Sequence, residues 1–437
     1  MKNKSEMIIL ILFLAANTIK LVFFRHAIIF CDFTTSIFIF NVLVSFTVSV
    51  IIYLSLMLST NRKLLISFYS IQTLFLMANL LYFDAYESYL YLSKALCLIR
   101  EGMAVARHGM IPVDFHSLIL LIDMPFLILL LHKYKGITAL VRKMNKLTIY
   151  TVSLILLIGV YSYTYHTVGS PFDTRLNKYG DARVVRFYGL SVTLIKDLIS
   201  YTEKNMADCL APSSTTVSGE ERKTKSNLIL IQVESLDSNI INYQYENNPV
   251  MPYLNSLTNT SIYYPYVLSY HKAGGTSDAE FSIINSIEPL DNYPSMSIKN
   301  YKYPNSMVKQ LNQAGYSTYV FHGNDPDFWN RKSAFMQMGY KKFYSRIEMN
   351  LKQKGWGASD GDVFTYVLNK MDSETSPFFY HIITMSSHLP YTNVCKYYHN
   401  KQFDDIPESS VRNYFNSMSY TDKMLREFIE RVKCKTD

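Results

Sequence analysis

The fold is decided by the stretch NLILIQVES, residues 227–235, in which a continuous apolar run ends at the carboxylate of Glu234. Two similar runs follow, YSTYVF at 316–321 and PFFYHIIT at 377–384, and each comes after a segment with helical character. Continuous apolar strands between helices are typical of a parallel sheet with helices on both faces. The sequence therefore predicts an α/β domain over residues 227–437.

The preceding part of the chain has a different composition. The chain is 49% hydrophobic and 18% charged over 437 residues, and almost all of its long apolar runs lie before residue 166. Each run is near the ~20 residues that a helix needs to cross ~30 Å of hydrocarbon. These runs predict a five-helix transmembrane domain over residues 1–165, with spans at 7–24, 34–58, 64–83, 114–132 and 148–165.

Basic residues predict the orientation of this domain. They lie before the first span (Lys2 and Lys4), between the second and third (Arg62 and Lys63), and between the fourth and fifth (133–146). Loops rich in Lys and Arg stay in the cytoplasm, so an odd number of spans places the α/β domain outside. The net charge of +8 arises partly from these loops, and we expect no nucleic-acid partner.

Two other features belong to the membrane half and its exit. Asp114 and Asp123, near the fourth span, are expected to face the bundle or the interface. Residues 166–226 are expected to form a connector. In it, the stretch 187–199 has apolar residues at helical spacing, and the polar stretch 212–226 has the composition of a linker.

A glycine pair precedes a predicted helix in HKAGGTSDAEF, residues 271–281. Ser277 and Glu280 have the spacing of a capping box, which would start a helix running to about Ser286. Free N–H groups at a helix start suit a phosphoryl group, and glycines let the backbone approach a ligand closely. Spacing alone does not decide whether Thr276 or Ser277 is the reactive hydroxyl.

Glu234 lies at the carboxyl end of its predicted strand, where ligands gather in parallel sheets. A hard cation would take an oxygen ligand there, although a carboxylate at a strand end can also simply cap or bridge.

Polar segments also follow the other two predicted strands. In FHGNDPDFWNR, residues 321–331, Arg331 could pair with a phosphate, or Trp329 and Arg331 could be a packing residue and a surface charge. In TMSSHLPY, residues 384–391, His388 could donate to a phosphoryl oxygen or a leaving group.

In order and approximate spacing, these four segments resemble the lipoteichoic acid synthase family, within the sulfatase and alkaline phosphatase superfamily. The resemblance covers roughly residues 180–437, and it identifies 355–360, GWGASD, as a structural turn before a helix. It implies Thr276 as the nucleophile, Glu234 and Thr276 as ligands of a divalent metal, and Mn²⁺, or else Mg²⁺, as that metal. The substrate-binding residues that it implies are Asn324, Trp329, Arg331 and His388, with Asn324 standing where some members have an acid.

The resemblance also implies an activity. Such an enzyme takes the phosphoglycerol head group of phosphatidylglycerol onto the threonine, releases diacylglycerol, and passes the group to a glycerolphosphate polymer or another envelope acceptor. The expected location is the bacterial cell membrane, with several spans and an extracellular C-terminal domain.

One part of the family pattern is absent. Family members complete the metal site with a consecutive Asp-His on a later strand, and this sequence contains no Asp-His pair. Residues 411–432 look like the helix before that strand, so we expect a C-terminally incomplete domain and a chain that is inactive or nearly so.

Three alternatives are considered, and the third is the least favoured. The chain could be a non-catalytic, membrane-anchored binding or regulatory relative, or another phospho-group transferase such as a phosphoethanolamine transferase. A sulfuric ester hydrolase would need Cys or Ser in a C/S-x-P-x-R frame, which residues 274–278 do not provide.

Overall fold

The structure is a computed structural model. It describes residues 2–27, 35–58, 61–86, 89–92, 115–133, 145–170, 181–203, 226–268, 274–290, 294–298 and 301–435, with a few single residues between these ranges. The chain groups into two compact units. One comprises Met1–Leu96 and Ile111–Glu203, and the other comprises Cys97–Met110 and Lys204–Asp437.

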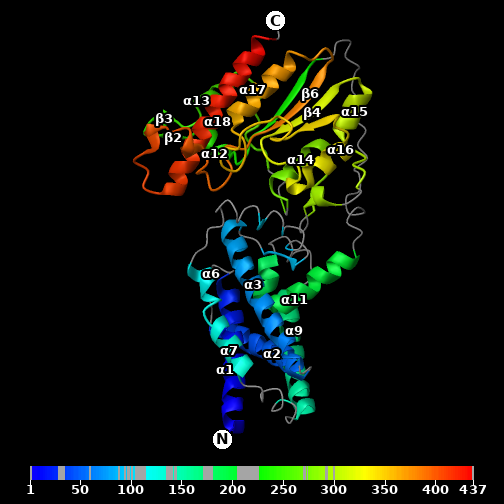
Figure 1. The fold of residues 1–437 in the computed structure, drawn as a ribbon, viewed down its shortest axis with the longest axis vertical. Helices are drawn as coiled ribbons and strands as arrows, with labels where there is room; N and C mark the ends of the chain where they lie inside the picture. The colour runs from blue at the N-terminus through cyan, green and yellow to red at the C-terminus, as the bar shows by residue number, and fades with distance from the viewer. Residues whose placement is uncertain are drawn as a thin grey trace. The chain divides into compact units, whose positions relative to one another are not determined.

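The first unit is helical (Figure 1). Among the described residues, four of its helices are long and apolar enough to cross a membrane, by length and composition. They are α1 (Lys2–Ala27), α2 (Thr35–Leu58), α3 (Arg62–Tyr86) and α9 (Lys146–Val168). These four fall on four of the five predicted spans.

The remaining predicted span, 114–132, is not one continuous helix. It consists of α6 (Phe115–Ile119) and α7 (Met124–Lys133), joined by a turn. Pro125, in the first turn of α7, explains the break, because proline lacks the N–H that a continuing helix would use and its ring clashes with the carbonyl four residues earlier, at Leu121 in the turn. The count of five spans stays a prediction.

A charge pair between the buried Lys20 and the partly exposed Asp123 ties this broken segment to its neighbours. Lys20 of α1 lies 2.8 Å from the carboxylate of Asp123, in the turn between α6 and α7. Its ammonium also donates to the hydroxyls of Tyr69 (3.0 Å) and Thr73 (3.1 Å) on α3. Asp123 therefore faces other helices, as expected, whereas Asp114 lies outside the described residues.

The predicted connector contains a helix, α11 (Asp181–Glu203), which is kinked at Gly189 with φ +80°. A left-handed φ is a conformation that glycine adopts readily, so the kink falls at the one residue suited to it. Most of the predicted linker, 212–225, lies outside the described residues. The predicted domain boundaries stay a prediction.

The second unit contains a four-stranded parallel sheet in the order β1-β6-β4-β5 (Figure 1). Its strands are β1 (Leu228–Gln232), β4 (Ser317–His322), β5 (Lys342–Tyr344) and β6 (Phe378–Ile383). Its helices are α12 (Ser238–Ile241), α13 (Pro252–Leu257), α14 (Thr276–Asn285), α15 (Met307–Gln313), α16 (Arg331–Met338), α17 (Asp360–Met371) and α18 (Ser409–Lys433). A short hairpin of β2 (Gln244–Tyr245) and β3 (Asn248–Pro249) lies apart from the sheet.

Helices cover both faces of the sheet. Alternate strand residues point to opposite faces, and Val320 packs with α14, α15 and α16 whereas Phe321 packs with α17 and α18. Because both faces are buried, the strands read as continuous apolar runs. The predicted fold, apolar N-terminal helices followed by an α/β domain with a mostly parallel sheet, is confirmed.

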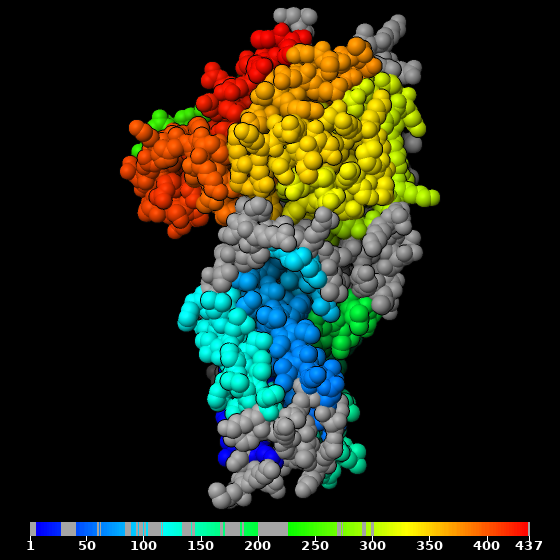
Figure 2. Space-filling model, viewed as in Figure 1, coloured from blue at the N-terminus to red at the C-terminus, as the bar shows by residue number. Residues whose placement is uncertain are grey.

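Figure 2 shows α17, in orange, and α18, in red, side by side on the surface of this unit. The buried carboxylate of Asp422 on α18 accepts the backbone N–H groups of Tyr253 (2.9 Å) and Leu254 (2.8 Å). These are first-turn donors of α13 that have no partner within their own helix. One side chain of α18 therefore fixes the start of α13.

Candidate active site

The polar segments predicted from the sequence meet at one edge of the sheet. Parallel strands end at a common edge, and Glu234, His322 and Thr384 lie at or just beyond the ends of β1, β4 and β6. Hydrogen bonds join these segments. The backbone N–H of Glu234 donates to the hydroxyl of Thr384 at 2.8 Å, and the hydroxyl of Ser387 donates to the carbonyl of Glu234 at 2.6 Å.

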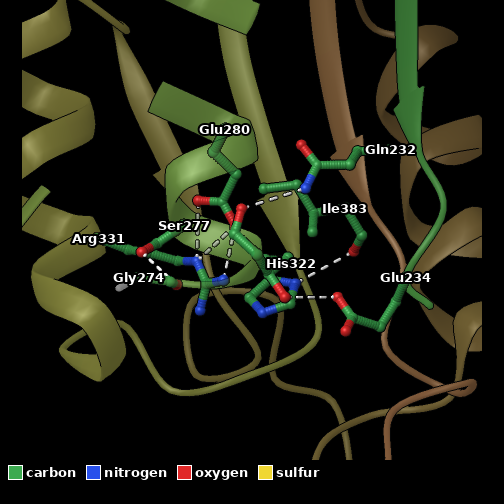
Figure 3. A network of polar contacts seen from close by, with 9 residues as sticks. Gln232, Glu234, Gly274, Ser277, Glu280, His322, Arg331 and Ile383 are labelled. Carbon is green, nitrogen blue, oxygen red and sulfur yellow. Dashed lines mark hydrogen bonds and ion pairs between the residues drawn. The ribbon is translucent and has the colours of Figure 1, made fainter. Parts of the chain in front are cut away.

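Glu234 and Thr276 are in direct contact (Figure 3). The Thr276 hydroxyl donates to Oε2 of Glu234 at 2.8 Å, although 42 positions separate the two residues. Thr276 is the first residue of α14. A carboxylate that accepts this proton is arranged to act as a base toward the hydroxyl.

The glycine turn before α14 requires glycine for two different reasons. Gly275 has φ +53°, in the left-handed region. At Gly274 a Cβ would lie 2.5 Å from a carboxylate oxygen of Asp278, closer than atoms can pack. Asp278 is fully buried and accepts the backbone N–H groups of Gly274 (2.7 Å), Ser295 (3.1 Å) and Lys272 (3.3 Å).

Two expectations about the helix start are wrong. The first-turn N–H groups of Ser277 and Asp278 are not free for a ligand, because they donate to the carbonyls of Gly274 (3.1 Å) and Gly275 (3.0 Å). The capping box does not form either. The helix begins after Gly275 with no side-chain cap, and the Ser277 hydroxyl donates to Gly274.

The other half of the expected capping box, Glu280, forms an ion pair with Arg331 instead (Figure 3). Nε of Arg331 lies 3.0 Å from both carboxylate oxygens, and Nη2 lies 2.6 Å from Oε1. Burial raises the pKa of Glu280, and the Arg331 charge opposes that rise. Arg331 is also buried, and its hydrogen bonds to other described residues use Nε and Nη2 rather than Nη1.

His322 is a site residue that the sequence reasoning did not single out. Its Nδ1 donates to the carbonyl of Ile383 at 3.1 Å, and its Nε2 is buried with no hydrogen-bond partner among the described residues. Burial, and then the nearby Arg331 charge, hold the pKa of His322 well below its ordinary value. A lowered pKa favours the neutral ring, in which Nε2 is an acceptor because Nδ1 holds the proton given to Ile383. Its one sequence signal was its place at the end of a predicted strand.

Asn324 and Trp329 follow on the same loop. Asn324 is buried, its Oδ1 accepts the backbone N–H of Asp325 at 2.8 Å, and its Nδ2 has no partner among the described residues. Trp329 is half-buried with φ +57°, and its ring lies 5.8 Å from that of Phe328. The side-chain amide of Asn324 is thus a donor without a partner among the described residues, and the Trp329 side chain is partly exposed.

His388 is held by the turn that the sequence identified as structural. Its ring stacks on Trp356 at 5.6 Å, and Trp356 also contacts Phe328 at 5.4 Å. His388 Nδ1 donates to the carbonyl of Leu389 at 2.6 Å, which leaves Nε2 as the nitrogen available to a ligand.

Asp360 is a further buried carboxylate, at the start of α17. Burial raises the pKa of Asp360 to about 6, and its carboxylate accepts the backbone N–H groups of Met385 and Ser386.

The predicted metal ligands do not amount to a complete site. Glu234 and Thr276 provide two oxygens of the kind that hard cations prefer. Within the described ranges, no group of three or more His, Cys, Asp or Glu side chains could hold a metal ion. The described residues by themselves therefore do not fit a divalent ion.

Known proteins resemble this chain. Residues 226–436 match the Sulfatase family. Lipoteichoic acid synthase 2 of Bacillus subtilis is 28% identical over 270 residues, which cover 57% of this chain and 41% of that protein. Lipoteichoic acid synthase of Staphylococcus saprophyticus is 31% identical over 218 residues, which cover 48% and 34%. The chain thus spans less than half the length of these relatives.

A solved structure resembles nearly the whole chain. It is the integral membrane protein lipooligosaccharide phosphoethanolamine transferase A of Neisseria meningitidis, with a TM-score of 0.63 and 14% identity, covering 98% of this chain and 80% of that one. This likeness shows the fold. The four long apolar helices, by their length and composition, support a location in a membrane.

Residues 226–436 therefore form a domain of the sulfatase and alkaline phosphatase superfamily, a superfamily of enzymes. Within that superfamily the chain is similar to the lipoteichoic acid synthases named above, and the resemblance found in the sequence is confirmed.

Proposed function

We propose that this chain is a membrane-anchored transferase that moves the phosphoglycerol group of phosphatidylglycerol, through an intermediate on Thr276, to a cell-envelope acceptor. The observation that carries the proposal is the 2.8 Å contact between the Thr276 hydroxyl and Glu234 at the start of α14. The relatives named as lipoteichoic acid synthases support this substrate class. A glycerolphosphate polymer is the expected acceptor.

The first half-reaction replaces one ester bond with another. Oγ1 of Thr276 bonds to phosphorus, and the bond from phosphorus to the diacylglycerol oxygen breaks. The Thr276 proton passes to Glu234, and the departing oxygen takes a proton from Nε2 of protonated His388.

In the second half-reaction, an acceptor hydroxyl bonds to phosphorus and the bond to Thr276 breaks. The proton on Glu234 returns to Thr276, and the acceptor proton passes to His388. Both side chains thus end in their starting states.

The remaining residues would bind the substrate. Nη1 of Arg331 is the edge of the guanidinium left for a phosphoryl oxygen, because Glu280 occupies the other edge. The neutral Nε2 of His322 and the free amide of Asn324 suit the hydroxyls of glycerol. Trp329 would pack against the carbon atoms of the glycerol.

We include a divalent metal, Mn²⁺ or Mg²⁺, in the proposal, because the match to the Sulfatase family supports metal binding. When bound, it would favour the alkoxide form of a threonine. Glu234 and Thr276 would be two of its ligands, and the rest would have to come from outside the described residues.

The apolar N-terminal helices and the basic loops between the predicted spans support a membrane location. We propose a bacterial cell membrane protein with several spans and an extracellular α/β domain, which would place the site on the side of the envelope acceptor.

A substitution at Thr276 tests the function. A version of the chain extended by a strand with consecutive Asp and His, and the Thr276→Ala variant of that version, are reconstituted in lipid nanodiscs with labelled phosphatidylglycerol and Mn²⁺, because Glu234 and Thr276 alone hold a divalent ion poorly. Diacylglycerol release and the mass of the peptide that contains residue 276 are then measured. We expect a phosphoglycerol adduct on Thr276 and no release by the variant. Thr365→Ala is the matched control, because this helical threonine on α17 bonds only to the carbonyl of Gly361.

Substantial release by the Thr276→Ala variant would reject the nucleophile. Binding of the lipid head group without an adduct, and without release under any metal condition, would instead favour the non-catalytic binding relative.

A further inference from the structure

The Glu280–Arg331 pair differs from the other ion pairs of the described residues. Its side chains are only 0% and 3% exposed. Every other described ion pair has at least one side chain that is more than a fifth exposed. Burying both charges costs several kcal/mol per ion, which only close geometry with several hydrogen bonds offsets. A pair kept at that cost merits a functional explanation.

The pair connects the two segments that would contact the substrate. Glu280 lies one helical turn after Thr276 on α14, so the two side chains project from the same side of that helix. Arg331 begins α16, directly after Trp329 and Asn330. The ion pair is therefore a direct link between the threonine helix and the loop that carries the tryptophan.

That loop has a strained backbone. Trp329 and Asn330 have φ values of +57° and +56°, a left-handed conformation that asparagine tolerates and that is strained for a bulky side chain such as tryptophan. The Asn330 amide donates to the carbonyl of Met296 at 2.7 Å, which holds one end of the turn. The turn directs the Arg331 side chain back to α14, and Glu280 holds it there.

We propose that Glu280 is a positioning residue that fixes Arg331 and the 328–331 turn against α14, so that Thr276 and Nη1 of Arg331 face the same phosphoryl group. This inference rests on the proposed function. Glu280 takes Nε and Nη2 of the guanidinium, which leaves one donor edge with a defined direction. It also balances the Arg331 charge, so Arg331 would bind the phosphoryl group by directed hydrogen bonds rather than by a net positive charge.

Hydrogen exchange tests the positioning without turnover. Full-length wild type and Glu280→Gln are compared in nanodiscs by the exchange of backbone amides in 274–280 and 328–334. We expect about tenfold faster exchange in both segments, because a lost ion pair lowers the cost of local opening. Glu374→Gln is the matched control. It removes a mostly buried carboxylate that pairs with Lys370 at 3.3 Å and accepts the Tyr380 hydroxyl at 3.2 Å. Exchange in Glu280→Gln no faster than in Glu374→Gln would overturn the proposal.

Binding of glycerol 1-phosphate is the second measurement, because a purely structural pair would leave it unchanged. We expect about tenfold weaker binding by Glu280→Gln, with Arg331 still present but misdirected. If wild type does not bind this probe while the exchange still responds, the proposed substrate is wrong and the positioning role stands. If binding is unchanged in Glu280→Gln, the positioning role is wrong.

Two more variants separate positioning from stability. The Glu280→Gln/Arg331→Gln double variant removes both buried charges, so its unfolding temperature should recover while exchange in 274–280 stays fast. Recovery of slow exchange as well would show that the pair is only structural. Should Glu280→Gln fail to fold, Glu280→Asp keeps the charge on a shorter side chain and should bind the probe more weakly than wild type.

Discussion

Four acidic side chains of the candidate site have different hydrogen-bond partners. Glu234 accepts a hydroxyl proton, Asp278 accepts three backbone N–H groups, and Glu280 pairs with a guanidinium. Asp360 accepts two backbone N–H groups on the neighbouring loop. Of these, Glu234 alone has an acidic oxygen that faces the hydroxyl of Thr276. The partner, rather than the residue type, therefore identifies the carboxylate that can act on Thr276.

The glycine pair provides a test at the residue scale. We expect Gly274→Ala to destabilise the α/β unit by roughly 1–3 kcal/mol, because its Cβ would clash with the Asp278 carboxylate, which three N–H groups hold in place. Gly275→Ala should cost about 1 kcal/mol, because nothing lies within 4 Å of its Cβ and only the left-handed φ is unfavourable.

Fluorescence-monitored urea unfolding measures both glycine variants, because the two tryptophans of the chain, Trp329 and Trp356, lie in this unit. Equal losses in the two variants would contradict the clash.

The sequence predicted the contact between Glu234 and Thr276 only through the family resemblance, since no local pattern joins residues so far apart. Local reasoning failed at Glu280. A capping box links two residues three positions apart, here Ser277 and Glu280, whereas the partner that Glu280 takes, Arg331, is 51 positions away. His322 was missed for a related reason, because the burial that lowers its pKa depends on the assembled sheet.

At the scale of elements, continuous apolar runs predicted β1, β4 and β6 to within about one or two residues, because buried parallel strands need such runs. The edge strand β5 was missed, since its three residues, Lys342–Tyr344, are too few to show a pattern. The span at 114–132 was taken as one helix because its hydrophobicity is continuous, whereas Pro125 interrupts the backbone hydrogen bonds.

The first turn of α17 should make stability depend on pH. Asp360 has a pKa of about 6 in the folded state and 3.8 as its ordinary value, so the folded state binds the proton more tightly. Its contribution is therefore full below about pH 4 and is lost as the pH rises to about 6. Asp360→Asn should remove this slope, which amounts to roughly 1–3 kcal/mol between the two limits.

Unfolding measured at several pH values checks the Asp360 prediction. Asp362→Asn is its control, because Asp362 is a partly exposed carboxylate in the same turn that pairs with Lys354. A slope in Asp360→Asn as steep as in wild type would show that another group is responsible.

The intramembrane pair gives a second test at this scale. Asp123→Asn should destabilise the helical unit by roughly 3–5 kcal/mol, because it leaves the buried Lys20 charge without its partner, and Lys20→Met should cost less, because Asp123 is 28% exposed. The double variant Lys20→Met/Asp123→Leu should regain most of that loss. Helix content followed during SDS titration measures all three. A double variant less stable than either single variant would mean that the pair contributes more than its burial costs.

At the scale of the whole molecule, orientation is the first property to test. Cys395 and Cys434 are exposed thiols of the α/β unit. In a version with Cys31, Cys97 and Cys209 replaced by serine, an impermeant maleimide should label both on intact cells. The control is Lys143→Cys in a loop predicted to be cytoplasmic, which should react only after permeabilisation. Protection of Cys395 and Cys434 on intact cells would reverse the topology.

The last prediction concerns the metal. Glu234 and Thr276 supply two oxygens, and we expect the 437-residue chain to turn over slowly or not at all, because two ligands hold a divalent ion poorly. Without a bound cation, Thr276 stays a neutral hydroxyl and a poor nucleophile. The comparison is this chain against a version extended by a strand with consecutive Asp and His, each assayed for Mn²⁺ content and for diacylglycerol release from labelled phosphatidylglycerol. We expect metal and release in the extended version alone, and both should disappear when Thr276→Ala is added. Equal release from the two versions would show that a residue outside the described ranges already completes the site.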